Sequence, residues 1–130
     1  MMKFLSPALA AALLVFLSSP SFAAHPGLVQ TGIASYYHDS LHGNRTASGQ
    51  IYDKNKMSAA HKTLPLGSRV RVTDKRTGKS IVVWVNDRGP FVKGRVIDLS
   101  RRAARELGMI RRGITPVKVE VLSVAGRRGA

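Results

Sequence analysis

The most constraining feature of this sequence is an apolar run of five residues, Ile81 to Val85, that stops abruptly at a turn. β-Branched residues dominate the run, which is typical of a strand, and we expect it to be buried on both faces. Residues 86–90 (N-D-R-G-P) combine charge with a glycine and a proline, which favour a turn. A second apolar segment, Arg95 to Leu99, follows. The stretch therefore predicts two strands joined by a tight connection.

Asp87 stands where the first of these strands ends. If the pleat continues to the strand end, Asp87 lies on the same face as Val83 and Val85. A carboxylate held on a rigid element beside a loop is a common position for a catalytic acid. Acids at strand ends also accept turn hydrogen bonds without any catalytic role, so spacing alone leaves both interpretations open.

Residues 1–23 have the pattern of a signal peptide. After Lys3 comes an apolar run of 11 residues, Pro7 to Leu17, and the small residues beyond it suit cleavage after Ala23, or else after Ala24. The run is shorter than the ~20 residues needed to span a bilayer. The chain contains no cysteine, which excludes a lipobox cysteine, disulfides and a thiolate metal site. We therefore expect an exported protein, periplasmic or secreted, that is soluble and has no stable membrane anchor.

The net charge of the whole chain is strongly positive, at +14. Such a surface attracts polyanions, which include nucleic acids, acidic lipid headgroups and anionic cell-wall polymers. Export argues against nucleic acid, and so do the even spread of basic residues and the scarcity of aromatic ones, with one Trp and three Tyr. An acidic wall or envelope is the more plausible partner of a basic exported domain, but charge alone does not choose among these polyanions.

The rest of the chain consists mainly of short strand-like segments separated by turns. Alternating or apolar patterns at 28–37, 57–61, 68–73 and 116–124 predict four further strands. Ser100 is a suitable N-cap and Gly108 a suitable C-terminal stop, which predict one helix between them. Short strands, one helix and tight turns favour a small β-barrel over a sandwich or a βαβ sheet. We place this single domain at 24–124, followed by a basic tail at 125–130.

A polar, turn-rich segment at 38–49 follows the first strand. Its two Gly, its Thr and its Ser, close to Tyr36 and Tyr37, would suit the hydroxyl groups of a sugar. A solvated surface loop explains the same composition equally well, so both interpretations stay open.

Five motifs occur in order along the chain and together resemble the rare lipoprotein A family. They are G-I-A-S-Y-Y at 32–37, T-A-S-G at 46–49, A-A-H-K-T-L-P-L-G at 59–67, V-N-D-R-G-P-F at 85–91 and R-V-I-D-L-S at 95–100. The resemblance covers residues 32 to about 122. It implies a mainly β protein, a six-stranded double-psi β-barrel with one or two short helices.

Members of that family are bacterial endolytic peptidoglycan transglycosylases, related by fold to expansins. The resemblance implies a lyase that cleaves the β-1,4 bond between N-acetylmuramic acid and N-acetylglucosamine. It further implies a preference for naked glycan strands without stem peptides, and products with 1,6-anhydro ends. No cofactor or metal is implied, and the expected partner is the glycan strand, bound by a monomer. Non-catalytic glycan binding, as in expansins, is the alternative interpretation.

The resemblance also implies the site residues. Asp87 is the expected catalytic acid and base, with Asp53 and His61 lining the same groove. The expected substrate-binding residues are Tyr36, Tyr37, Thr46, Ser48, Gln50, Asn86 and Arg88. One carboxyl group suffices because the C6 hydroxyl of the substrate replaces the attacking water, for which a hydrolase needs a second carboxylate.

Three further positions carry expectations. Gln50 stands where many members of the family have Glu, and an amide keeps hydrogen bonding without ionising. Asp98 is expected to act as a cap or turn acceptor near the start of the helix. Trp84 is expected in the core or in the wall of the groove.

Overall fold

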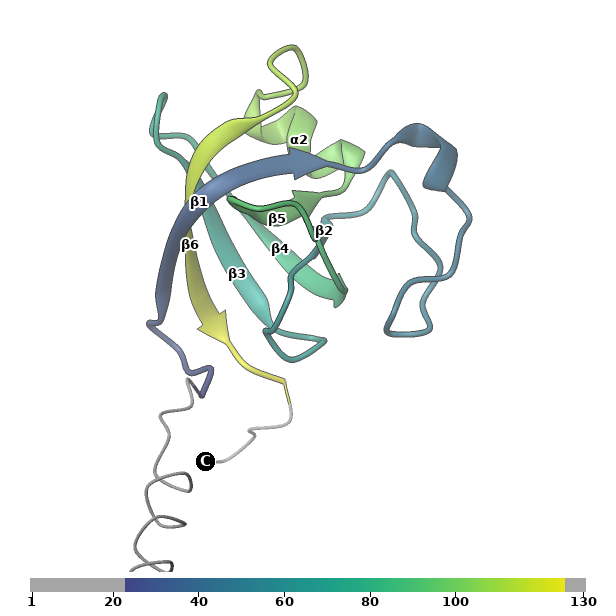
Figure 1. Cartoon of the computed structure of the whole chain (residues 1–130), viewed down its shortest axis with the longest axis horizontal. Helices are drawn as coiled ribbons and strands as arrows, with labels where there is room; N and C mark the ends of the chain where they lie inside the picture. Colours follow the sequence, from purple (N-terminus) through teal and green to yellow (C-terminus); the bar gives the residue numbers. More distant parts are fainter. Residues whose placement is uncertain (1–22, 126–130) are drawn as a thin grey trace, which may run out of the picture.

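Six strands form a closed barrel in the computed structural model, which describes residues 23–125 (Figure 1). In chain order the elements are β1 (Val29–Tyr36), the 3₁₀ helix η2 (Asp39–Leu41), β2 (Ser58–Ala60), β3 (Arg69–Asp74), β4 (Ser80–Asp87), β5 (Arg95–Leu99), the helix α2 (Arg101–Leu107) and β6 (Thr115–Ser123). The predicted barrel is confirmed. Almost all of the predicted signal peptide and basic tail lies outside the described residues.

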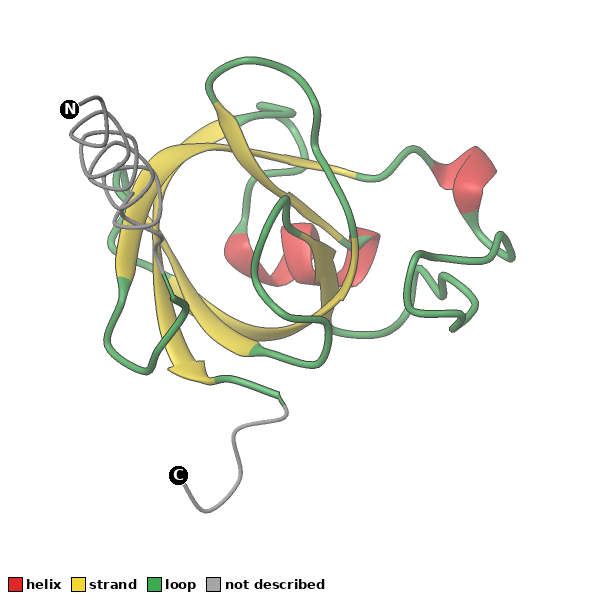
Figure 2. Cartoon of the chain, turned by 60° about the horizontal axis from the view of Figure 1, so that its bottom comes forward, coloured by secondary structure: helices red, strands yellow, loops and turns green. Residues whose placement is uncertain are grey.

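The strands are hydrogen-bonded in the order β1-β5-β2-β4-β3-β6, so most neighbours in the barrel are not neighbours in the sequence. β1 pairs in parallel with β5, and β2 with β4, whereas the other pairs are antiparallel. Figure 2 shows the strands as a ring, with α2 visible through its opening. The strand ends and the loops after them therefore determine which residues meet at the surface.

Alternate side chains of the strands point into the barrel and form its core. The valines that are at most 1% exposed are Val70, Val72, Val83, Val85, Val117 and Val119. The expectation that the run from Ile81 to Val85 is buried on both faces is wrong, because Val82 and Trp84 are 37% and 52% exposed. One face of β4 lines the barrel interior, and the other is open to solvent at these two positions.

The helix α2 begins and ends at the predicted residues. The Ser100 hydroxyl accepts a hydrogen bond from the Ala103 N–H at 3.2 Å, and Gly108 adopts the left-handed conformation with φ 82°. Ala103, Ala104 and Leu107 are buried in the barrel core, so the helix packs its apolar face against the barrel. The caps and the apolar spacing together explain why this short segment is helical.

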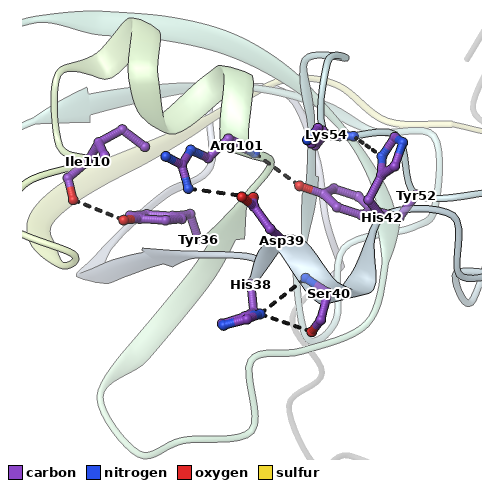
Figure 3. Close-up of polar contacts among 9 residues, drawn as sticks. All are labelled: Tyr36, His38, Asp39, Ser40, His42, Tyr52, Lys54, Arg101 and Ile110. Atoms are coloured by element: carbon purple, nitrogen blue, oxygen red, sulfur yellow. Dashed lines mark hydrogen bonds and ion pairs between the residues drawn. The ribbon is translucent and has the colours of Figure 1, made fainter.

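The loop from Tyr37 to Met57 is fastened to the start of α2 (Figure 3). The Arg101 N–H donates to the Tyr52 hydroxyl at 3.0 Å, and the Arg101 guanidinium contacts Asp39 at 3.5 Å. Tyr37, Tyr52 and Ala60 form a second, smaller buried cluster under this loop. The amino-acid pattern of this loop has no regular period, and η2 is its only helix among the described residues.

Neither helix in the described part of the chain is long and apolar enough to cross a membrane. That observation covers residues 23–125 and does not extend to the predicted signal peptide.

Asp74 is a fully buried carboxylate at the end of β3. It accepts hydrogen bonds from the Arg112 guanidinium, from the Thr115 hydroxyl at 3.1 Å and from the Arg76 N–H at 2.8 Å. We expect Asp74→Ala to lower the free energy of unfolding by about 3–5 kcal/mol, because it leaves partly buried Arg112 unpaired. Urea denaturation measures this change.

Asp39→Ala is the matched control, since the Asp39–Arg101 pair is solvent-exposed. Its effect on the free energy of unfolding should stay within about 1 kcal/mol. Equal losses in the two variants would contradict a structural role for the buried Asp74 pair.

Candidate functional site

A shift in strand pairing turns Asp87 out of the barrel. Ala59 pairs with Val85, but the next residue, Ala60, pairs with Asp87, so β4 carries one extra residue, Asn86. Ala60 belongs to the buried cluster outside the barrel core, and register partners share a face of the sheet. Asp87 therefore lies on the outer face, and the expectation that it shares a face with Val85 is wrong. Such bulges re-aim side chains near functional sites.

Both oxygens of the half-buried Asp87 carboxylate accept hydrogen bonds. Oδ1 accepts from the Ala47 N–H at 2.8 Å and from the Arg88 N–H at 2.9 Å. Among residues 23–125, Oδ2 accepts a hydrogen bond only from the Tyr37 hydroxyl, at 2.5 Å. The loop and the residue just after β4 thus fix the carboxylate together, and Oδ2 is the oxygen with bonding capacity to spare.

Tyr37 is itself held by a stack of aromatic rings. Its ring lies on that of Tyr52, with centroids 4.3 Å apart and an angle of 11° between the planes. Burial, and then the hydrogen bond to the Asp87 carboxylate, raise the pKa of Tyr37. Burial also raises the pKa of Tyr52. Both phenols therefore keep their protons at physiological pH, and Tyr37 acts toward Asp87 as a neutral hydrogen-bond donor.

A second carboxylate, Asp98, lies on the same outer face. Asp87, Ala60, Asp98 and Ser35 are register partners across β4, β2, β5 and β1. Two strand spacings separate the Cα atoms of the two acids, which amounts to about 10 Å. The Ser35 hydroxyl donates to the Asp98 carboxylate across the strands, whereas the helix cap is Ser100. Asp98 is therefore a cross-strand acceptor, not the cap or turn acceptor that we expected.

An open groove runs along the outer face beside Asp87. It consists of three hollows of about 550, 420 and 400 Å³, and Gln50 and Asn86 line all three. The Asn86 amide donates to Gln50 Oε1 at 3.1 Å. We call this surface the Gln50 groove. Asp87 follows Asn86 in the chain and does not itself line any of the three hollows.

Several other expected site residues contribute to the groove or to the loop beside it. Asp53 lines the largest hollow, and its Oδ1 accepts from the Asn55 N–H at 2.8 Å. Ser48 lines the second hollow. Thr46 is buried, and its hydroxyl donates to the Gln50 carbonyl at 2.8 Å, so it shapes the turn that presents Gln50.

Two of the expected substrate-binding residues, Tyr36 and Arg88, point elsewhere. The Tyr36 hydroxyl donates to the Ile110 carbonyl at 2.9 Å (Figure 3) and makes no hydrogen bond to Asp87 within residues 23–125. Arg88 donates to the carbonyl groups of His61 and Leu64, at 3.1 and 2.6 Å. These bonds hold the backbone next to Asp87, so the guanidinium is occupied by the protein itself.

His61 is a buried residue, 4% exposed, and it faces a different cavity from Asp53. Its Nδ1 accepts from the N–H groups of Thr63 and Leu64, both at 3.1 Å. Nε2 therefore carries the proton, and it donates to Gln30 Oε1 at 2.7 Å. The backbone N–H of His61 donates to the Asp87 carbonyl at 3.0 Å, so His61 supports the strand end that carries Asp87.

Sequence reasoning did not assign a role to Gln30, Ser35 or Ala47. The first two contact His61 and Asp98 across strands that are distant in sequence, and Ala47 acts through its backbone. No local pattern marks such contacts. Among residues 23–125, no group of three or more His, Asp or Glu side chains is placed to hold a metal ion.

Burial, and then the charges of Arg88 and Lys62, lower the pKa of His61 to about 4. The unfolded chain, with a histidine pKa near 6.5, binds the proton first, so stability should fall as the pH drops from about 6.5 to about 4. The loss should reach about 3 kcal/mol. NMR titration of the ring and urea denaturation across this range measure both effects.

The variant His61→Gln should lack this pH-dependent loss, because glutamine does not titrate. A His61 ring that titrates near pH 6.5 in the folded protein would contradict the proposed hydrogen-bonding state.

Comparison with known proteins places this geometry in a family. A family model described as lytic transglycolase matches residues 29–119. The endolytic peptidoglycan transglycosylase RlpA of Pasteurella multocida is 56% identical over 98 residues, which are 75% of this chain and 33% of that protein. A protein of a Nostoc species, named as a probable endolytic peptidoglycan transglycosylase RlpA, is 57% identical over 93 residues, which are 70% of this chain and 25% of that protein. The chain thus spans about a third or less of the length of these relatives.

Solved structures agree on the fold. The Streptomyces papain inhibitor is 25% identical, with a TM-score of 0.63 over 77% of this chain and 99% of that one. An expansin of Clavibacter michiganensis is 21% identical, with a TM-score of 0.59 over 73% of this chain and 50% of that one, which shows the fold alone. The chain belongs to the lytic transglycolase family, with the double-psi β-barrel of the rare lipoprotein A group.

Proposed function

We propose that this protein is an endolytic peptidoglycan transglycosylase with Asp87 as its catalytic acid and base. It cleaves the β-1,4 bond between N-acetylmuramic acid and N-acetylglucosamine, prefers strands without stem peptides, and leaves 1,6-anhydro ends. One observation carries the proposal: the Asp87 carboxylate is held by three hydrogen bonds on the outer face, next to Asn86, which lines an open groove. An open groove suits an enzyme that cuts within a long chain.

The reaction needs one proton to travel to the substrate and one to return. Asp87 Oδ2 donates its proton to the glycosidic oxygen, and the C1–O bond breaks with its electron pair on that oxygen. The C6 hydroxyl oxygen of the same muramic residue then bonds to C1 and releases its proton to Asp87. No water is consumed, and Asp87 ends in its starting state.

The surroundings of Asp87 support a single-carboxyl mechanism. Oδ1 is occupied by two backbone N–H groups, which fix the orientation of the carboxyl and leave Oδ2 for proton transfer. Tyr37 keeps its proton because its pKa is raised. It therefore stays a neutral hydrogen-bond donor that orients Oδ2 and does not carry a negative charge of its own. Asp98 lies about two strand spacings away and is bonded to Ser35, so it is not poised beside Asp87.

Binding of the glycan would use the Gln50 groove. Gln50, Asn86 and Ser48 offer amide and hydroxyl groups to the sugar, and Asp53 places a negative charge at the same surface, where it would stabilise an oxocarbenium-like centre. His61 and Arg88 serve by holding the backbone that carries Asp87. The net charge of +14 attracts the protein to an acidic envelope, in keeping with export to the periplasm.

Asp87→Asn should abolish the release of anhydro-ended fragments from peptide-free glycan strands, because an amide cannot cycle the proton. The loss of rate should be about 10²–10⁴-fold. Mass analysis of the soluble products measures it, since anhydro ends are lighter than hydrolysed ends by one water. Glu120→Gln is the control, because Glu120 pairs with Arg71 outside the groove.

The other outcomes separate the alternatives. Hydrolysed ends would call for a second group that activates water, with Asp53 the first to substitute. Binding to sacculi without any product, in the wild-type protein, would favour an expansin-like role in glycan binding.

Tyr37→Phe should lower the rate of anhydro-product formation by about tenfold, with KM little changed. The variant keeps the stack on Tyr52 and removes only the hydrogen bond to Asp87 Oδ2. Kinetics on peptide-free strands, together with urea denaturation, separate a positioning role from general destabilisation. An unchanged rate would remove Tyr37 from the mechanism.

A further inference from the structure

Trp84 is the only tryptophan of the chain, and it is 52% exposed on the outer face of β4. Its strand partner Arg69 places the guanidinium carbon 5.7 Å from the centroid of the ring system. Such cation–π contact holds the indole in place without covering it. Single exposed apolar side chains are ordinary, but an exposed aromatic ring that lines a groove offers a binding surface.

The position of Trp84 connects it to the candidate site. It lies three residues before Asp87 in the same strand, which corresponds to about 10 Å along β4. Trp84 lines the two smaller hollows of the Gln50 groove, and both share Gln50 and Asn86 with the largest hollow. A chain bound across the groove beside Asp87 would therefore reach the indole.

The groove between Trp84 and Asp87 has polar atoms to offer. The Asn86 amide nitrogen donates to Gln50 Oε1, which orients both side chains. Gln50 Nε2 and Asn86 Oδ1 have no hydrogen-bond partner among residues 23–125. A donor and an acceptor side by side match an acetamido group, which carries one carbonyl oxygen and one N–H.

We propose that Trp84 forms a sugar-stacking subsite, in which the indole packs against the ring of an N-acetylhexosamine residue some distance from the scissile bond. The C–H groups on one face of a pyranose ring are apolar and bury against the indole, while Gln50 and Asn86 bind the acetamido group. This inference rests on the proposed function for the identity of the glycan, and on the groove for its location. The subsite determines how far the bound strand extends past Asp87.

The single tryptophan makes the proposal directly measurable. In the Asp87→Asn variant, which does not turn over substrate, we expect peptide-free glycan strands and chitohexaose to shift the emission to shorter wavelengths with saturation. The shift arises because stacking removes the half-exposed indole from water. Isothermal calorimetry on the same samples gives the affinity. Binding by calorimetry without any change in emission would overturn the subsite.

Substitutions test the same point without fluorescence. In the Asp87→Asn background, Trp84→Ala should weaken binding of chitohexaose by about tenfold, and Trp84→Phe should weaken it less, since a phenyl ring still stacks. Ile114→Ala is the control, because Ile114 is similarly exposed, at 46%, and does not line the groove. Unchanged affinity in Trp84→Ala would overturn the proposal.

Three further outcomes distinguish the subsite from the proposed reaction and from non-specific binding of anions. An emission shift in a wild-type protein that forms no anhydro product would support the subsite and defeat the proposed reaction. Product formation at the wild-type rate in Trp84→Ala would defeat the subsite and leave the reaction standing. The basic groups Arg69, Lys56 and Arg102 lie near the ring, so poly-L-glutamate is the anionic probe. An equal, salt-sensitive shift with that probe would overturn sugar stacking.

Discussion

The one-residue shift between β2 and β4 is the constraint on which the candidate site depends. If β4 continued in regular register past Val85, with Asn86 opposite Ala60, strand alternation would direct Asp87 into the barrel, among the valines of the core. A carboxylate there would have no water and few hydrogen-bond donors. The shift instead places Asp87 outside, where Tyr37 and the backbone of Ala47 satisfy it. The barrel holds the end of β4 rigidly, and the bulge places the Asp87 carboxylate on the outer face.

The loop after β1 completes the site because Tyr37 and Tyr52 hold it against the barrel and α2. Tyr37 begins it at the barrel, and Tyr52, stacked on Tyr37, is held by the backbone at the start of α2. Between these rings the loop presents the N–H of Ala47 and the side chain of Gln50. An aromatic stack with raised phenol pKa values stays neutral across the physiological range, so Tyr37 remains a hydrogen-bond donor to Asp87.

Much of the fold could be predicted from local patterns. Ser100 and Gly108 mark the ends of α2 because a cap depends on a residue and its nearest neighbours. The strands near 68–73 and 116–124 follow from alternation for the same reason. The prediction failed for the outer face of β4, where five apolar residues in a row look buried on both sides although Trp84 is half-exposed.

The sequence by itself determined most of the elements and the family, because short motifs and apolar periodicity encode local structure, and the family resemblance made Asp87 the leading candidate for the catalytic acid. Only the tertiary structure decided which way the carboxylate points, that His61 faces Gln30, and that Asp98 bonds Ser35. Those contacts join strands that are distant in the chain, and their geometry depends on pairing register. A one-residue shift in register reverses the face of a side chain without leaving any trace in the local pattern.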